Sequence, residues 1–180
     1  MSDGAPLELW RVDFVLCREA LTAAEAMTPR LPLATDLAEG SDRRLAHIAL
    51  RIVIERFLGA GARRVPFAVA SGGRPEVPMA DLSFSLSHTR GVALLAVGRR
   101  GPLGIDIELP RAVRIAGRRR QAIQRAGAAL GADPAACAAD DDAAFLRAWT
   151  RLEALAKADG CGMGRMLGRL GAWGGPVLSD

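Results

Sequence analysis

The sequence predicts an α+β protein, because short strand patterns alternate with amphipathic helix patterns along its 180 residues. Apolar and polar residues roughly alternate from Leu7 to Val15, as expected for a half-buried strand. Apolar residues recur at near-helical spacing from Ser41 to Leu58 and again from Phe145 to Ala158. A chain of this length can bury one ordinary core or two small halves.

Capping and turn residues set the elements of the first hundred residues. Residues from Ala20 to Met27 predict a short helix. Ser41 suits the start of the next helix, which Gly59 ends. Val65 to Ala70 predicts a short strand, followed by a turn from Ser71 to Pro75. Three further strands with tight connections predict a small sheet: Phe84 to Leu86, Val92 to Val97 and Leu103 to Ile107.

Beyond Pro110 the sequence predicts helices joined by a loop. Arg111 to Leu130 is rich in arginine and is expected to be helical. Ala132 to Asp142 is rich in alanine and aspartate and is expected to be a loop. The helix from Phe145 to Ala158 is amphipathic, and Gly160 ends it.

Charge and cysteine usage narrow the class of protein. Net charge is +4, and 24 residues are lysine or arginine, of which only Lys157 is lysine. Arginine presents donors that suit phosphate oxygens, so the basic net charge points to a polyanionic ligand, an acidic protein partner or nucleic acid.

Cys17, Cys137 and Cys161 lack metal-ligand spacing, and no secretion signal is recognisable. We therefore expect reduced thiols and a cytoplasmic location. No apolar run approaches the roughly 20 residues that span a bilayer, so no membrane partner is expected.

Two short motifs carry acidic residues, and one of them also contains the lysine. Asp106 and Glu108 lie two residues apart, which places both on one face of an extended strand. Glu153 and Lys157 are four apart and share a helix face. Magnesium prefers oxygen ligands and commonly bridges carboxylates and substrate phosphates. The motifs therefore suggest a magnesium site that handles a phosphate ester. The alternative is that Asp106 and Glu108 are exposed acids at a strand end and that Glu153 and Lys157 form an ion pair on a helix surface. Such a pair contributes ~0.3–0.5 kcal/mol to stability.

Hydrogen-bond donors at turns and strand ends add to this pattern. Ser87 and His88 close a predicted strand, where a hydroxyl and an imidazole can donate to phosphate. Arg74 lies in a tight turn between Gly73 and Pro75, where its guanidinium can meet a terminal phosphate. Taken singly, His88 is also compatible with a solvated turn, and Arg74 with an ordinary surface residue.

In their order and spacing, four motifs resemble those of the larger, pseudo-dimeric class of 4′-phosphopantetheinyl transferases. They are Gly73-Arg74-Pro75, the Phe-Ser-Leu-Ser-His-Thr run at 84–89, Gly-Ile-Asp-Ile-Glu at 104–108, and Trp-Thr-Arg-Leu-Glu-Ala-Leu-Ala-Lys at 149–157. The resemblance covers roughly residues 7 to 164. It implies two pseudo-symmetric α/β halves, residues 1–108 and residues 109–180. The second half is shortened, because family members usually continue with further strands.

The resemblance also implies a reaction and a role for each motif residue. The serine oxygen of an acyl or peptidyl carrier protein would attack the β-phosphate of coenzyme A, releasing 3′,5′-ADP. Asp106, Glu108 and Glu153 would hold Mg²⁺ against the pyrophosphate. Glu153 would also be the candidate general base, directly or through water. The other implied contacts to coenzyme A phosphates come from Lys157 at the reacting centre, Arg74 at the 3′-phosphate, Ser87, His88, and either Arg43 or Arg44.

Two departures keep other functions open. Leu152 stands where the family usually has lysine, which together with the short second half allows a catalytically silent homologue that only binds coenzyme A. The run Arg118 to Arg120 allows a basic nucleic-acid-binding protein, although aromatics make up only 4% of the chain, too few for base stacking on single strands. On the transferase interpretation these arginines, with Arg111 and Arg114, would steer an acidic carrier protein. We expect no nucleic-acid partner.

Overall fold

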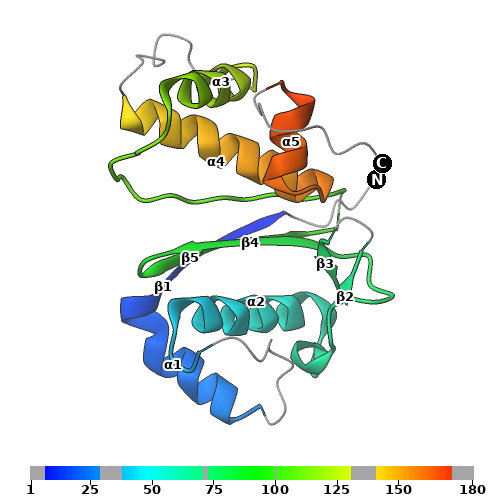
Figure 1. The fold of residues 1–180 in the computed structure, drawn as a ribbon. Coiled ribbons are helices and arrows are strands. Elements are labelled where there is room, and N and C mark those ends of the chain that lie inside the picture. The colour runs from blue at the N-terminus through cyan, green and yellow to red at the C-terminus, as the bar shows by residue number, and fades with distance from the viewer. Residues whose placement is uncertain (1–6, 29–37, 71–72, 100, 131–140, 172–180) are drawn as a thin grey trace.

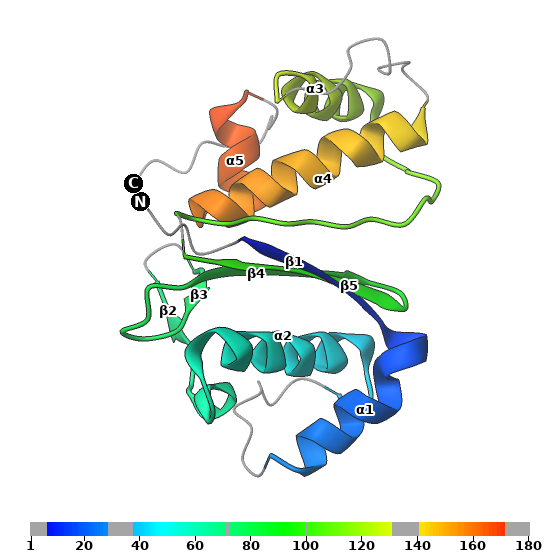
Figure 2. The same cartoon turned by 180° about the vertical axis from the view of Figure 1, so that it is seen from behind.

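The computed structural model describes residues 7–28, 38–70, 73–99, 101–130 and 141–171, and it places helices on both sides of a small sheet (Figure 1). The sheet is antiparallel with the order β1-β5-β4. Its strands are β1 (Glu8–Asp13), β4 (Ser83–Thr89) and β5 (Val92–Gly98). Seen from behind, α1 and α2 cover one face, while residues 101–116 and then the C-terminal helices lie beyond the other (Figure 2).

The core of the first half lies between the sheet and helix α2 (Asp42–Leu58). Ser41 accepts a hydrogen bond from the Arg44 amide at 3.2 Å, and Gly59 ends the helix with a φ of 93°. Ile54 and Leu95 are among the fully buried side chains that this packing produces. The helix predicted from Ser41 to Leu58 and the strands predicted around residues 84–86 and 92–97 are confirmed.

Helix α1 (Phe14–Ala26) begins earlier than the sequence analysis predicted. The Asp13 carboxylate accepts hydrogen bonds from the amides of Val15 at 2.9 Å and Leu16 at 3.4 Å. This cap ends β1 and starts the helix, so the strand predicted to run to Val15 stops two residues short of it. The helix predicted only from Ala20 is correspondingly longer.

A small second sheet replaces the strand predicted from Val65 to Ala70. The buried Arg51 of α2 donates to the Val65 carbonyl at 2.9 Å and lies 4.0 Å from the centre of the Phe67 ring. Burial lowers the pKa of Arg51 to about 10, so its charge persists at neutral pH. The chain here forms a short 3₁₀ turn, η1 (Ala62–Arg64), and two paired strands, β2 (Ala68–Val69) and β3 (Pro75–Glu76).

The described residues of the second half form a layer of three helices. They are α3 (Gly117–Ala128), α4 (Asp142–Asp159) and α5 (Met163–Arg169). Asp141 caps α4, and Gly160 ends it with a φ of 67°. Ile123, Leu152 and Leu167 are buried in a hydrophobic cluster separate from that of the first half. The predicted helix in α4 is confirmed, whereas α5 was not predicted. The division of the chain into residues 1–108 and 109–180 stays a prediction.

The connection between the halves differs from its prediction. No strand forms at residues 103–107, and the helix expected from Arg111 begins only at Gly117. The amides of Ile105 and Ile107 donate to serine hydroxyls of β4 rather than to its backbone, so no ladder is formed. Among residues 109–130 and 141–171 the second half is entirely helical or irregular. The α+β class is nevertheless confirmed for the molecule.

Some sequence predictions lie outside the described residues. These are positions 71–72 of the predicted turn, positions 132–140 of the predicted loop, and Cys137.

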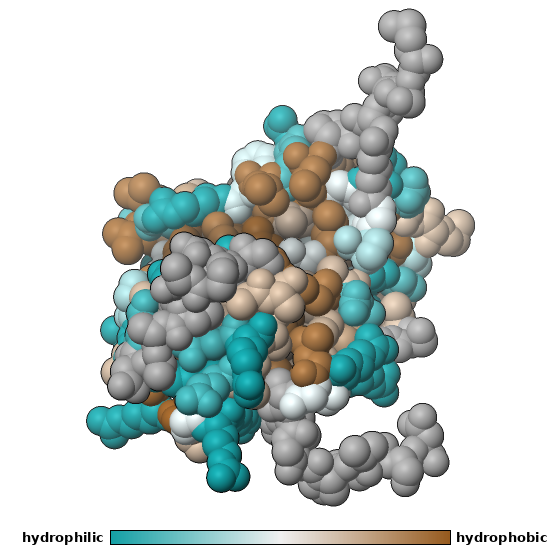
Figure 3. Space-filling view, turned by 90° about the horizontal axis from the view of Figure 1, so that it is seen from above, coloured by the Kyte–Doolittle hydropathy of each residue, from teal (hydrophilic) through white to brown (hydrophobic). Residues whose placement is uncertain are grey.

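None of the described helices combines the length and apolar character needed to cross a membrane. Hydrophobic side chains gather toward the middle of the face that the C-terminal helices present, with hydrophilic ones around much of its edge (Figure 3).

Candidate active site

The side chain of Lys157 contacts two residues that the sequence analysis placed, with Lys157 itself, at the catalytic centre. Its Nζ lies 2.7 Å from Asp106 Oδ1 and 3.6 Å from Glu153 Oε1. It also donates to the Ile105 carbonyl at 3.2 Å. Lys157 on α4 is thus hydrogen-bonded to Asp106, which lies 51 positions earlier in the chain. The structure therefore brings Asp106, Glu153 and Lys157 together.

Gly104 allows this meeting because it lets the extended segment pass directly against α4. A Cβ atom at position 104 would lie 1.8 Å from the Ala154 carbonyl oxygen and 2.7 Å from the Ala158 amide nitrogen. Both of those atoms are backbone, so they cannot move aside as a flexible side chain would. Only glycine fits, and Asp106 follows two residues later. The sequence analysis recognised Gly104 as part of a motif but gave it no role.

The carboxylate of Asp106 is buried, with only 4% of the side chain exposed. Its Oδ1 accepts a hydrogen bond from Ser87 Oγ at 2.7 Å and another from Lys157. Its Oδ2 is buried, and no group in the described part of the chain donates to it. A buried anionic oxygen without a partner is unfavourable, whereas a bound cation would satisfy it. Asp106 Oδ2 is therefore a candidate ligand for a cation.

Burial raises the pKa of Glu153 above its ordinary value. The negative charge of Asp106 acts in the same direction, while Lys157 and the Trp149 side chain oppose it. A carboxylate with a raised pKa is a stronger base and accepts a proton more readily near neutral pH. Glu153 is therefore suited to proton abstraction.

The raised pKa of Glu153 predicts that this residue lowers stability at neutral pH. The unfolded chain ionises glutamate near its ordinary pKa of about 4.3, whereas the folded protein does so only at higher pH. Between these two pKa values the folded state binds more protons, so stability falls as pH rises. Glu153→Gln removes this penalty. We expect the variant to be more stable at pH 7 by up to about 1 kcal/mol, a modest figure because water screens the exposed part of the side chain.

Chemical unfolding at several pH values measures this difference. The gain in unfolding free energy should shrink as pH falls and vanish once both states are protonated, near pH 4 and below. Glu19→Gln, at an exposed position on α1, is the matched control and should show no comparable gain. A Glu153→Gln variant that is less stable than the wild type at pH 7 would contradict the prediction.

Glu108 is engaged by Arg111. Its Oε1 accepts from Arg111 at 3.2 Å, in a pair whose side chains are 21% and 53% exposed. Within the described ranges, no group of three or more histidine, cysteine, aspartate or glutamate side chains is arranged to hold a metal ion. The magnesium site built from Asp106, Glu108 and Glu153 stays a prediction, of which two members meet.

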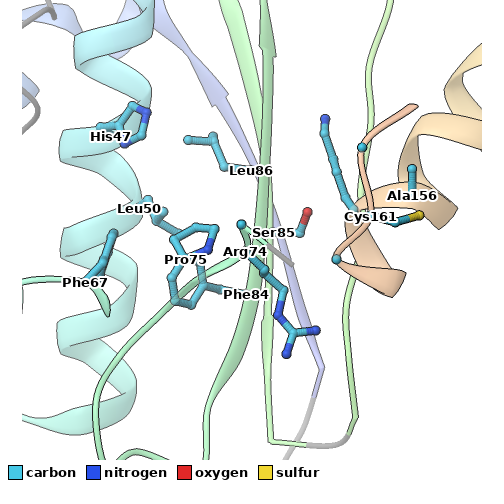
Figure 4. Close-up of a pocket in the computed structure, with 14 residues that line it drawn as sticks. His47, Leu50, Phe67, Arg74, Pro75, Phe84, Ser85, Leu86, Ala156 and Cys161 are labelled. Atoms are coloured by element: carbon cyan, nitrogen blue, oxygen red, sulfur yellow. The ribbon is translucent and has the colours of Figure 1, made fainter. Parts of the chain in front are cut away.

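Two neighbouring pockets open beside this centre, and they share His47, Leu86 and Lys157 as lining residues. The larger pocket measures about 410 Å³ and the smaller about 320 Å³. Figure 4 shows the larger one beside β4, with Leu50 and Phe67 on the α2 side and Cys161 on the α4 side. The smaller one is lined by Arg43, His47, Leu86, Ser87, His88, Glu153 and Lys157.

The remaining predicted residues divide between the pockets and the rest of the molecule. Arg74 lines the larger pocket and donates to the Ala158 carbonyl at 3.3 Å. His88 and Arg43 line the smaller one. Arg44 instead pairs with Glu25 of α1, and this hydrogen bond raises the pKa of Arg44. Of the two arginines left open by the sequence, Arg43 is the one at the pocket.

His47 is the lining residue that sequence reasoning missed. It contributes to both pockets from α2, one helical turn beyond Arg43. Residues four apart on a helix share a face, so the position of Arg43 was a usable signal for His47. Cys161, which lines the larger pocket, carried no such signal because it follows the end of α4.

Leu152 does not face the candidate site. Its side chain is fully buried in the hydrophobic cluster of the second half, together with Phe145 and Leu167. The apolar residue at a position where the resemblance suggests lysine therefore completes the packing of α4. It leaves the arrangement of Glu153 and Lys157 on another face of the same helix unaffected.

Comparison with known proteins agrees with the motif resemblance. Residues 102–171 match the sequence model of the 4′-phosphopantetheinyl transferase superfamily. The matched stretch contains Asp106, Glu108, Glu153 and Lys157. No curated protein matches the chain. The assignment to the larger, pseudo-dimeric class stays a prediction.

Proposed function

We propose that this protein moves the 4′-phosphopantetheine group of coenzyme A to a serine of an acyl or peptidyl carrier protein. The proposal is supported by the match of residues 102–171 to a 4′-phosphopantetheinyl transferase superfamily domain. The observation that carries the proposal is the contact of Lys157 with both Asp106 and Glu153 beside two pockets. The free thiols of Cys17 and Cys161 are compatible with the cytoplasmic location proposed from the sequence.

The side chains of the site suit the two demands of phosphoryl transfer, which are positioning and neutralisation of charge. Glu153 accepts the proton of the carrier serine hydroxyl, directly or through water. The serine oxygen then forms a bond to the β-phosphorus of coenzyme A, and the bond from that phosphorus to the bridging oxygen breaks. The products are phosphopantetheinyl-serine and 3′,5′-ADP. Lys157 offers its ammonium group to the phosphate oxygens.

Asp106 Oδ2 and the Glu153 carboxylate are the groups that would hold magnesium. Glu108 would join them by leaving Arg111, with which it forms a partly exposed pair. Pairs at the protein surface typically contribute about 0–1 kcal/mol. Bound Mg²⁺ would neutralise charge on the pyrophosphate and so stabilise the leaving group.

The two pockets provide a place for coenzyme A beside these carboxylates. Arg74 supplies a guanidinium to the larger pocket, where it would meet the 3′-phosphate. Arg43 and His88 supply donors to the smaller pocket, where they would contact the remaining phosphates. The apolar part of the larger pocket, which includes Phe84 and Leu86, suits the less polar portions of the ligand.

The arginines near α3 do not form one continuous basic surface. Arg120 is buried, pairs with Asp142 and lies 5.4 Å from the centre of the Phe145 ring. Arg111 is engaged with Glu108. These contacts remove part of the basic run that motivated nucleic-acid binding. Exposed Arg118 is among the residues that would steer an acidic carrier protein.

Transfer can be tested directly by mass spectrometry. The protein is incubated with coenzyme A, Mg²⁺ and a panel of apo acyl and peptidyl carrier proteins, and each carrier is weighed. We expect one phosphopantetheine to be added to at least one carrier, and none when its acceptor serine is replaced by alanine. Tight, magnesium-dependent binding of coenzyme A in calorimetry without any mass gain would instead identify a silent homologue.

Lys157→Arg is expected to lower the transfer rate about 10- to 100-fold. The ammonium group is a compact point charge enclosed by Asp106, Glu153 and the Ile105 carbonyl, whereas a guanidinium is planar and longer. Initial rates at saturating coenzyme A measure the effect. Arg151→Lys, at an exposed position on the same helix, is the matched control and should be neutral. A wild-type rate in Lys157→Arg would show that the lysine is incidental.

A further inference from the structure

Two serine hydroxyls of β4 accept hydrogen bonds from the segment that lies over the face of the sheet opposite α2 (Figure 2). Among the described strands, β4 pairs only with β5, and residues 104–108 form no ladder with it. Ser85 and Ser87 are both buried, at 7% and 8% exposure, and they lie two positions apart. Two residues at this spacing share one face of a strand. Figure 4 shows Ser85 on the side of β4 away from α2.

The hydroxyls hold the backbone on both sides of Asp106. The Ile105 amide donates to Ser85 Oγ at 3.1 Å, and the Ile107 amide donates to Ser87 Oγ at 3.3 Å. These two contacts bracket the intervening residue, so the position of its Cα depends on both serines. The spacing of the serines on β4 matches the spacing of the two amides that they accept from.

Ser87 also sets the orientation of the Asp106 carboxylate. Its single hydroxyl proton is donated to Oδ1 at 2.7 Å. Lys157 donates to the same oxygen. Both donors therefore engage Oδ1, which leaves Oδ2 as the buried oxygen that accepts from no group in the described chain. The hydroxyl therefore helps to decide which carboxylate oxygen is left without a donor in the described chain.

We propose that Ser85 and Ser87 are positioning residues, which hold Asp106 so that Oδ2 is the carboxylate oxygen left for the proposed cation. The inference rests on the proposed function for the role of Asp106, but the geometry of the two serines does not depend on turnover. It differs from the expectation that Ser87 binds a coenzyme A phosphate, because the only proton of that hydroxyl is already used within the protein. It also gives a role to Ser85, which the motif resemblance left without one.

Amide hydrogen exchange followed by NMR tests the backbone contacts without any assay of activity. Ser87→Ala should speed exchange at the Ile107 amide about 3- to 10-fold, the factor expected for one lost hydrogen bond, and should affect Ile105 less. Ser85→Ala should produce the opposite pattern. Ser83→Ala is the matched control, because Ser83 lies on the same face of β4 and should change neither amide.

Steady-state kinetics of the carrier-modification reaction then separate positioning from ligand binding. Outer residues that orient a metal ligand typically contribute 10- to 100-fold to activity. We therefore expect Ser87→Ala to lower kcat by about that factor while the KM for coenzyme A changes little. Ser87→Thr restores the hydroxyl and should recover most of the loss. Thermal unfolding of each variant checks that it folds.

Two results would overturn the inference. One is unchanged exchange at Ile105 and Ile107 in both alanine variants. The other is a raised KM for coenzyme A with unchanged kcat in Ser87→Ala, which would make this serine a phosphate contact. If the wild type modifies no carrier protein, the proposed function fails, and the exchange pattern alone still decides whether the serines hold the segment.

Discussion

Asp106→Asn is expected to reduce phosphopantetheine transfer by about 10²–10³-fold or more. The substitution keeps the size of the side chain but removes the negative charge that Lys157 and the proposed cation both require. The fold should persist, because the part-exposed Lys157 keeps the Ile105 carbonyl and Glu153 as partners. Initial rates of carrier modification measure the loss, and circular dichroism confirms the fold.

Asp81→Asn provides the matched control for this prediction. Asp81 is exposed just before β4 and belongs to neither pocket. Its variant should transfer at the wild-type rate. Calorimetric titration with Mg²⁺ adds an independent measurement, because Asp106→Asn should also weaken cation binding. Turnover of Asp106→Asn at the rate of the control would show that the metal assignment is wrong.

Gly104→Ala is expected to lower both activity and stability. The added Cβ would lie 1.8 Å from the Ala154 carbonyl oxygen, so residues 104–108 must move away from α4. Overpacking of this kind typically costs about 1–3 kcal/mol, which for a chain of this size lowers Tm by about 2–4 °C for each kcal/mol. The same movement separates Asp106 from Lys157, and we expect a loss of transfer comparable to that of Asp106→Asn.

Gly164→Ala is the control that separates this steric effect from the general consequence of replacing a glycine. Gly164 lies within α5, and a Cβ there would meet no atom within 4 Å. Because alanine favours helix by up to about 1 kcal/mol over glycine, the variant should be as stable as the wild type or more so. If Gly104→Ala matched this control in Tm and in transfer rate, the close approach of the segment to α4 would not be required.

Local patterns were sufficient to predict several elements of the fold. Ser41 and Gly59 marked the two ends of α2, because capping depends on residues within one helical turn. Gly160 marked the end of α4 for the same reason. Asp13 also carried a local signal for the start of α1, which the alternation from Leu7 to Val15 obscured.

Other elements depended on packing that no local pattern reveals. Helix α5 contains glycines that disfavour helix formation, yet Met166 and Leu167 are buried. The segment from Leu103 to Ile107 has a strand-like pattern, but its amides meet serine side chains of β4 instead of a backbone ladder. Burial of its apolar side chains therefore determined that α5 is a helix. The serine side chains of β4 determined that the segment from Leu103 to Ile107 forms no ladder.

For the candidate site, the motifs identified Asp106, Glu153 and Lys157 from residue type, order and spacing, and these depend only on the chain. The contact of Lys157 with Asp106 required the helical layer to pack on the segment beside β4. The pairing of Glu108 with Arg111 and the burial of Leu152 were likewise results of tertiary packing. Hydrogen bonds and caps within one turn can be predicted from neighbouring residues. The meeting of side chains about fifty positions apart depends on which surfaces bury each other, and that depends on the whole molecule.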